Sequence, residues 1–231
     1  MKTFLRLGFA AVALTLYFGA FAAIEINAQN PLPEILKRMD DHYKALKSLK
    51  ADITRAQYNA QLQETDVSLG KITLIPGKGR NFSLRLDWKK PKEETLSVVN
   101  GQYVAYIPNI KRAYTGSSDS KTVNDKGGNV LKIMSMSKED LKANYNIQFL
   151  GQENIIGNVT TWHLKLTPKT ATNFKFADLW IDGNGMPVQG KVTRLNNDTD
   201  SVALGNLGKN ADINGSIFKV TLPKGTEMIK S

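Results

Sequence analysis

The chain has 231 residues, of which 41% are hydrophobic and 23% charged, and it contains no cysteine. This composition excludes collagen-like, low-complexity and wholly disordered chains. Without cysteine, the chain cannot form disulfides, thiolate metal sites or an N-terminal lipid attachment. The 31 Lys and Arg residues outnumber the 21 Asp and Glu residues, which gives a formal net charge of +10. Such a surplus favours contact with anionic surfaces, such as lipid headgroups or an acidic partner.

Residues 1–28 predict an export signal that is cleaved from the mature protein. Lys2 and Arg6 give a positive start, residues 9–23 form an uncharged apolar run, and small residues from Ala22 onward offer cleavage sites between 22 and 28. A transmembrane anchor is the alternative, because this early run approaches the roughly 18 apolar residues that can span a bilayer. We expect an exported, periplasmic protein with one domain over 29–231, and no nucleic-acid partner, since its lysines are scattered.

An amphipathic helix is predicted at 34–50, where apolar residues from Ile35 to Leu49 recur every three or four positions. Short runs rich in β-branched and aromatic residues follow, separated by turn residues. Asn100-Gly101 predicts a tight hairpin, and 76–79 and 183–187 predict further reversals. The expected strands are eleven: 51–59, 66–75, 80–88, 95–99, 102–107, 145–150, 160–167, 174–182, 188–195, 201–207 and 217–222.

The middle of the chain interrupts the strands. Residues 116–128 hold one apolar residue in thirteen and predict a mobile surface loop. Asn129 is a candidate cap for a short helix, and Ser137-x-x-Asp140 is a near capping box for a second one that runs through Asn144. The predicted fold class is therefore α+β. We expect an incomplete, strongly bent antiparallel β-barrel of about eleven strands, with an N-terminal helix and short mid-chain helices.

Alternation along two strands predicts an apolar interior. In strand 80–88, the even-numbered positions share one face, which is apolar except for Arg80 at its start. The Arg80 guanidinium could lie at the mouth of the apolar interior; the alternative is that it points into solvent at the strand start. Strand 160–167 turns Trp162 and Leu164 inward, which makes His163 a surface histidine. Met134 and Met136 add flexible thioether side chains of the kind found where a bound partner varies, and an ordinary core position is the favoured alternative.

The sequence offers no catalytic or metal site. His42 is expected to pack beside the apolar stripe of the first helix, far along the chain from His163. Asp178 and Asp182 stand roughly 13 Å apart on an extended chain, too far for a paired acid and base. Neither a nucleophile elbow nor a phosphate-binding loop is present. We therefore expect no enzyme activity and no cofactor.

Several motifs, in order, resemble those of the periplasmic outer-membrane lipoprotein carrier family, the LolA-like proteins. The segment GKITL at 70–74, LRLDW at 84–88 and Pro91 is similar to the family pattern "G-x-L … FRWEY-x-x-P". The resemblance covers about 32–229. Further matches lie at 39–51 in the first helix, at 98–108 ("V-x-DGK-x-x-W-x-YdP"), at 179–187, and at 218–227 ("F-x-F-x-x-PkG-x-e").

The resemblance implies a non-enzymatic, monomeric carrier that shuttles lipoproteins, or other acylated amphiphiles, between an inner-membrane release complex and an outer-membrane acceptor. Helices would cover the open barrel, and a family arginine that holds them corresponds to Arg80, the expected lid latch. A lipid-sensing or regulatory envelope protein of the same fold, or an envelope-assembly protein without a ligand, is the alternative. The residues expected to bind lipid are Phe82, Leu84, Leu86, Trp88, Met134, Met136, Trp162 and Leu164.

Overall fold

The structure, a computed structural model, describes residues 30–77, 82–120, 123–155 and 157–230. All elements below belong to the unit that begins at Pro31. The expected export signal and Arg80 lie outside the described residues, so both remain predictions.

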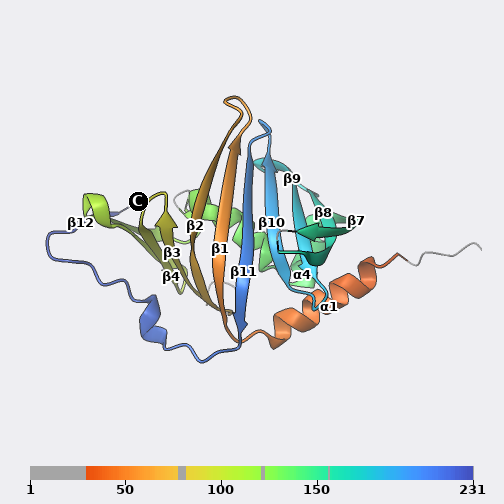
Figure 1. The fold of residues 1–231 in the computed structure, drawn as a ribbon, viewed down its shortest axis with the longest axis horizontal. Coiled ribbons are helices and arrows are strands. Elements are labelled where there is room, and N and C mark those ends of the chain that lie inside the picture. Colours follow the sequence, from red (N-terminus) through yellow and green to blue (C-terminus); the bar gives the residue numbers. More distant parts are fainter. Residues whose placement is uncertain (1–29, 78–81, 121–122, 156, 231) are drawn as a thin grey trace, which may run out of the picture. The chain divides into compact units, whose positions relative to one another are not determined.

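The described residues form one sheet of twelve strands in the order β12-β6-β5-β4-β3-β2-β1-β11-β10-β9-β8-β7 (Figure 1). Neighbouring strands are antiparallel, except that β12 lies parallel to β6. The sheet curls but does not close, because β12 and β7 remain its two edges, which confirms the expected incomplete barrel. The strands are β1 Leu49–Asn59, β2 Glu64–Ile75, β3 Ser83–Lys90, β4 Glu94–Val99, β5 Gln102–Ile107, β6 Arg112–Ser117, β7 Tyr145–Ile155, β8 Val159–Pro168, β9 Phe174–Asp182, β10 Pro187–Arg194, β11 Thr199–Lys209 and β12 Glu227–Lys230.

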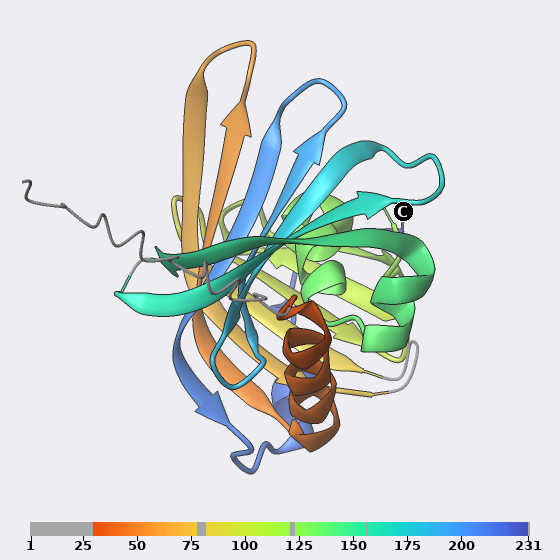
Figure 2. The ribbon, with the colours of Figure 1, turned by 90° about the vertical axis from the view of Figure 1, so that its right-hand side faces the viewer.

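Helices cover one face of this sheet, which we call the inner face. Figure 2 shows α1 and the green mid-chain helices within the curl of the strands. Ser137 caps α4 by accepting a hydrogen bond from the Asp140 amide, as the near capping box predicts. No helix in the described part of the chain is both long and apolar enough to cross a bilayer. The helices are α1 Leu32–Ala45, α3 Asn129–Met134 and α4 Lys138–Asn144, with a π-helical turn η2 Asn124–Gly128 and the 3-10 turns η1 Pro108–Ile110 and η3 Gly215–Phe218.

Two predicted reversals have the expected geometry. Asn100 and Gly101 have φ values of 49° and 76°, which a type I′ hairpin requires, and they join β4 to β5. In the second turn, Gly185 has φ 83° and its amide donates to the Asp182 carbonyl. The Asp182 carboxylate also accepts from the Met186 amide, so this turn at the end of β9 is held from both sides.

Two helix boundaries and one loop differ from the prediction. The first helix ends at Ala45 rather than at 50, because Ser48 bonds to the C-terminal part of the chain and β1 already begins at Leu49. Asn129 is not a cap, since the helical segment begins upstream of it. The second half of the expected mobile loop is helical, and Val123 within it is 6% exposed.

The C-terminal prediction is wrong in one respect. Residues 217–222 do not form a strand, because side chains rather than a backbone ladder hold this segment: Arg85 donates to the Ile217 carbonyl at 2.7 Å, and Ser97 donates to that of Phe218. The missed strands are β6 and β12. Both are short strands at one end of the sheet, and their polar residues give no clear alternation.

Candidate functional site

An apolar cavity of about 620 Å³ lies between the inner face of the sheet and the helices. Its volume falls within the roughly 300–1,000 Å³ typical of small-molecule sites. The apolar strand residues in its wall include Leu49, Ile72, Leu74, Leu84, Val98 and Leu204. The helices and the residues next to their ends add Met39, Tyr43, Leu46, Val123, Leu131, Met134 and Met136.

Helix α1 contributes a continuous stripe to the cavity. Met39, His42 and Tyr43 line it together with Leu46, the residue directly after the helix. Their i, i+3, i+4 and i+7 spacing places side chains on one helix face. Ile35 and Leu36 of the same helix are buried in the core, and the exposed side carries ion pairs such as Lys37 with Asp41 at 2.6 Å. One stripe of α1 thus forms a wall of the cavity.

A glycine lets α3 approach the sheet closely. A Cβ atom at Gly190 in β10 would lie 2.9 Å from side-chain carbons of Val130 and Met134. The absence of that Cβ lets α3 pack directly on β10 and brings Met134 to the cavity wall. Helix α3 therefore belongs both to the core and to the cavity wall. The sequence leaves these two positions open for Met134.

Four of the eight expected lipid-binding residues line the cavity: Phe82, Leu84, Met134 and Met136. The other four lie elsewhere. Leu86 and Leu164 are fully buried in the core, and Trp88 is 6% exposed further along β3. Trp162 packs beneath the guanidinium of Arg38, 5.3 Å from its ring centroid. Leu86, Leu164 and Trp88 are part of the core, and Trp162 contacts Arg38, so none of the four belongs to the cavity lining.

Sequence reasoning missed a buried ion pair on the inner face. Arg55 of β1 donates from Nε and Nη2 to the two carboxylate oxygens of Asp200 in β11, at 2.8 and 2.7 Å. Gly127, with φ 92°, lies directly over the Arg55 side chain. The alternation of Leu49, Ala51 and Ile53 would have placed position 55 on the inner face.

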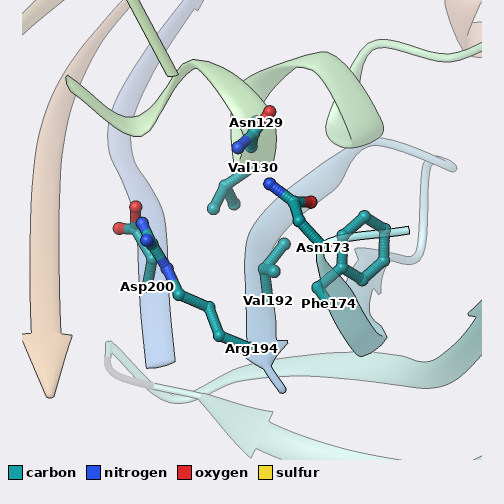
Figure 3. A pocket seen from close by; sticks show the side chains of 7 residues that line it. All are labelled: Asn129, Val130, Asn173, Phe174, Val192, Arg194 and Asp200. Atoms are coloured by element: carbon teal, nitrogen blue, oxygen red, sulfur yellow. The ribbon is translucent and has the colours of Figure 1, made fainter. Parts of the chain in front are cut away.

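Beside this ion pair is a small pocket, shown in Figure 3, between α3 and strands β9 to β11. Arg194 points toward Asp200, and Val130 and Val192 form the apolar side of the pocket. Its volume is about 10 Å³, enough for a single water molecule. This pocket is too small for an acyl chain, so the large cavity is the candidate binding site.

His163 is not the surface histidine that the alternation predicts. It does point to the outer face, but it is 9% exposed because Trp180 stacks on it at 4.4 Å. Its Nδ1 lies 2.7 Å from a Glu153 carboxylate oxygen, and its Nε2 lies 3.0 Å from one of Asp178. A hydrogen bond from the Trp180 indole is the main cause that lowers the pKa of Glu153. The described residues contain no group of three or more potential metal ligands.

His42 has an unusual environment within the cavity wall. Its Nε2 is buried and has no hydrogen-bond partner in the described residues. Burial lowers the pKa of this imidazole, and the nearby Lys209 lowers it further, while Asp182 acts in the opposite direction. The ring is therefore neutral at neutral pH.

The lowered pKa of His42 predicts an acid-sensitive contribution to stability. The unfolded chain, with a histidine pKa near 6.5, binds the proton more readily than the folded chain does. The contribution is thus present above about pH 6.5 and lost as pH falls through the lower pKa of the folded state. Urea unfolding between about pH 5 and 7 should show a smaller rise of stability with pH in His42→Gln than in the unaltered protein. Equal slopes would contradict a buried, neutral imidazole.

A curled, open antiparallel sheet with helices on its inner face and an apolar cavity between them defines the class of helix-covered, incomplete barrels. A family model described as "Outer membrane lipoprotein carrier protein LolA" matches residues 44–221, well over half of the chain. The chain belongs to this LolA family, as its motifs predict.

Solved structures that are similar to this chain share little sequence identity with it. An uncharacterized conserved protein from Thermus thermophilus is 11% identical with a TM-score of 0.55, and the match covers 87% of this chain and 99% of that one. A LolA superfamily protein from Nitrosomonas europaea (12% identity, TM-score 0.40, 81% and 97% covered) and lipoprotein LppX from Mycobacterium tuberculosis (13%, 0.46, 79% and 98%) are more distant in shape. At 11% identity, the similarity to the Thermus thermophilus protein supports the fold alone. No curated protein matches the chain.

Proposed function

We propose that this protein is a periplasmic carrier that binds the acyl chains of lipoproteins in its apolar cavity and shuttles them from the inner to the outer membrane. The cavity of about 620 Å³ is the observation that supports this proposal most directly. Membership of the lipoprotein carrier family points to the same class of cargo. A fold without a ligand would have no reason to keep such a space open, because cavities destabilise a core.

The physical task explains why a cavity is needed. Leaving one 16-carbon chain in water costs about 12 kcal/mol, at roughly 0.8 kcal/mol for each methylene. A monomeric carrier must therefore enclose the chain during transit and then give it up to a partner. The shuttle requires a release complex at the inner membrane and an acceptor at the outer membrane. The surplus of positive charge would favour encounters with anionic surfaces at both.

Filling the cavity should weaken binding without unfolding the protein. Leu74 lies in the cavity wall and is only partly buried, so Leu74→Trp can place its ring in the open space. A ring that expels two methylenes removes about 1.6 kcal/mol of burial, which is roughly a tenfold loss of affinity. The affinity can be measured by titration with a fluorescent 16-carbon acyl probe.

The matched control is Leu69→Trp in the same strand, where the leucine is 41% exposed and outside the cavity. This variant should bind the probe as the unaltered protein does. Transfer of a loaded lipoprotein from the carrier to outer-membrane vesicles then tests the shuttle itself, and only Leu74→Trp should carry less cargo. Equal binding by both variants would show that the probe does not occupy the cavity, and a carrier that binds but never transfers would overturn the shuttle.

A further inference from the structure

The curled sheet has two edges, and they differ in the length of strand that each offers. At one edge, β12 has only four residues and lies beside β6. At the other edge, β7 has 11 residues and pairs with β8 alone among the described residues (Figure 1). The unpaired side of a strand presents backbone N–H and C=O groups that can bind another chain in an extended conformation.

The first half of β7 lacks the features with which proteins usually protect an edge strand. Lysine, proline, inward-pointing charges and bulges are the common protections. Residues 145–150 contain no charged residue and no proline. A bulge occurs only at Gly151, where φ is 136° and the register with β8 shifts. The first charged residue is Glu153, and its carboxylate is engaged by side chains of β8 and β9. The regular part of the edge is therefore uncharged.

The side chains of this segment suit an added strand. Ile147 and Phe149 are half-buried and pack against the core, whereas Asn146 and Gln148 are exposed on the outer face. An extended peptide beside β7 would place its alternate side chains on the two faces of the sheet. Its apolar residues would extend the inner face, and its polar residues the outer face. The edge thus fits a peptide in which apolar and polar residues alternate.

The apolar cavity reaches the start of this edge. Asp140 and Asn144 of α4 line the cavity and are exposed, which places them at its rim. Asn144 is the last residue of α4, and β7 begins at the next residue, Tyr145. A chain that leaves the cavity beside Asn144 therefore meets the first residue of the unpaired edge.

We propose that the edge of β7 binds the first residues of the polypeptide of an acylated cargo protein as an added β-strand. The inference rests on the proposed function, because the acyl chains in the cavity bring the attached peptide to this edge. A lipoprotein carries these chains at its N-terminal residue, so its peptide starts at the rim and runs away from it, as β7 does. The added strand is therefore parallel to β7, the orientation that β12 has on β6.

Strand addition explains how one carrier can hold cargo proteins of different sequence. Main-chain hydrogen bonds provide the affinity in this mode of binding, and side chains provide the specificity. The bulge at Gly151 ends the regular edge, because an unpaired extra residue disrupts the ladder. The site therefore holds only the first few residues of the cargo, and the rest of that protein stays free.

The first test compares two ligands with the same 12-carbon chain. One is the peptide Val-Thr-Val-Thr-Val-Thr with a dodecanoyl group on its amino end, and the other is N-methyl dodecanamide, which lacks the peptide. Binding is measured by displacement of a fluorescent acyl probe. We expect the acylated peptide to bind about tenfold more tightly, the effect of about two net hydrogen bonds. Amide hydrogen exchange of residues 145–149 should slow with the acylated peptide and not with the amide.

Methylation of the peptide backbone shows whether the peptide forms a strand. Successive amides of a strand point in opposite directions, so only alternate N–H groups of the peptide face β7. Two further acylated peptides carry N-methyl groups on the valines or on the threonines. One of them should lose the tenfold gain, and the other should keep it. Equal affinities of the two methylated peptides would overturn the inference, because a contact that depends on side chains alone shows no such alternation.

A charge at Gln148 shows where the peptide lies. This side chain is exposed on the outer face, beside the expected polar side chains of the peptide. When lysine replaces the central threonine of the peptide, Gln148→Glu should raise the affinity about two- to fivefold and Gln148→Lys should lower it by a similar factor. The same two changes at Gln152, beyond the bulge, are the matched controls and should leave the affinity unchanged. Equal effects at both positions would contradict binding along residues 145–149.

The outcomes separate this inference from the proposed function. If neither ligand binds, the carrier function itself fails. If the amide binds and the peptide adds no affinity, the cavity holds chains but the edge of β7 is not a peptide site. If light scattering shows a dimer, and residues 145–149 are already protected from exchange without a ligand, a second copy of the chain occupies the edge. That result would also overturn the inference.

Discussion

Replacing Asp200 with Ala should lower the free energy of unfolding by about 3–5 kcal/mol, because the change leaves a buried arginine without its partner. The side chains of Arg55 and Asp200 are 6% and 5% exposed, and two hydrogen bonds join them. Gly127 lies over the Arg55 side chain, and both ionic side chains are largely shielded from bulk solvent. Urea unfolding measures the loss directly.

A double variant provides the matched comparison. Arg55→Met with Asp200→Leu removes both charges and fills a similar volume, so it should be much more stable than Asp200→Ala alone and close to the unaltered protein. If the double variant is as unstable as the single one, the loss comes from packing rather than from an unpaired charge. The inner-face ion pair would then be only a space-filling contact.

Replacing Gly185 with Ala should destabilise the protein by about 3 kcal/mol or more. Gly185 has φ 83°, a conformation that alanine adopts only with strain. A Cβ there would also collide with the backbone carbonyl of Arg38 in α1. The collision involves backbone atoms, which cannot move aside as a flexible side chain can. Thermal unfolding followed by circular dichroism measures the effect.

Gly183, in the same turn, gives the control. A Cβ at this position would have open space around it within 4 Å, so Gly183→Ala should change stability by less than about 0.5 kcal/mol. Similar losses in both variants would show that the turn, rather than its contact with α1, is sensitive. A loss confined to Gly185→Ala would confirm that this turn positions the helix that lines the cavity.

The sequence predicted the parts of the fold that depend on local patterns. Alternation located most strands, Asn100-Gly101 located a hairpin, and Ser137 located a helix start, because each signal lies within a few residues. The strand β12 was missed because its pairing with β6 joins residues that are far apart in the chain. Nothing in four residues near the C-terminus indicates that parallel pairing.

The candidate site was predicted only in part, for a related reason. Strand phase correctly placed Phe82, Leu84, Leu86 and Trp88 on a common face, but phase does not tell where along that face the helices leave open space. The same limit applies to Trp162, which meets Arg38 instead of the cavity. Burial of His163 depends on Trp180 of the neighbouring strand, a contact made across the sheet.

The pairing of β1 with β11 at the middle of the sheet has a consequence for how the chain folds. Arg55 and Asp200, which these strands bring together, are 145 positions apart. Contacts of such long range are entropically costly to close and slow the folding of a domain. During synthesis, β1 cannot acquire this neighbour until residues 199–209 have emerged, near the end of the chain. The nascent protein therefore stays incompletely folded for most of its synthesis, the condition in which a chain can still be threaded through a narrow channel.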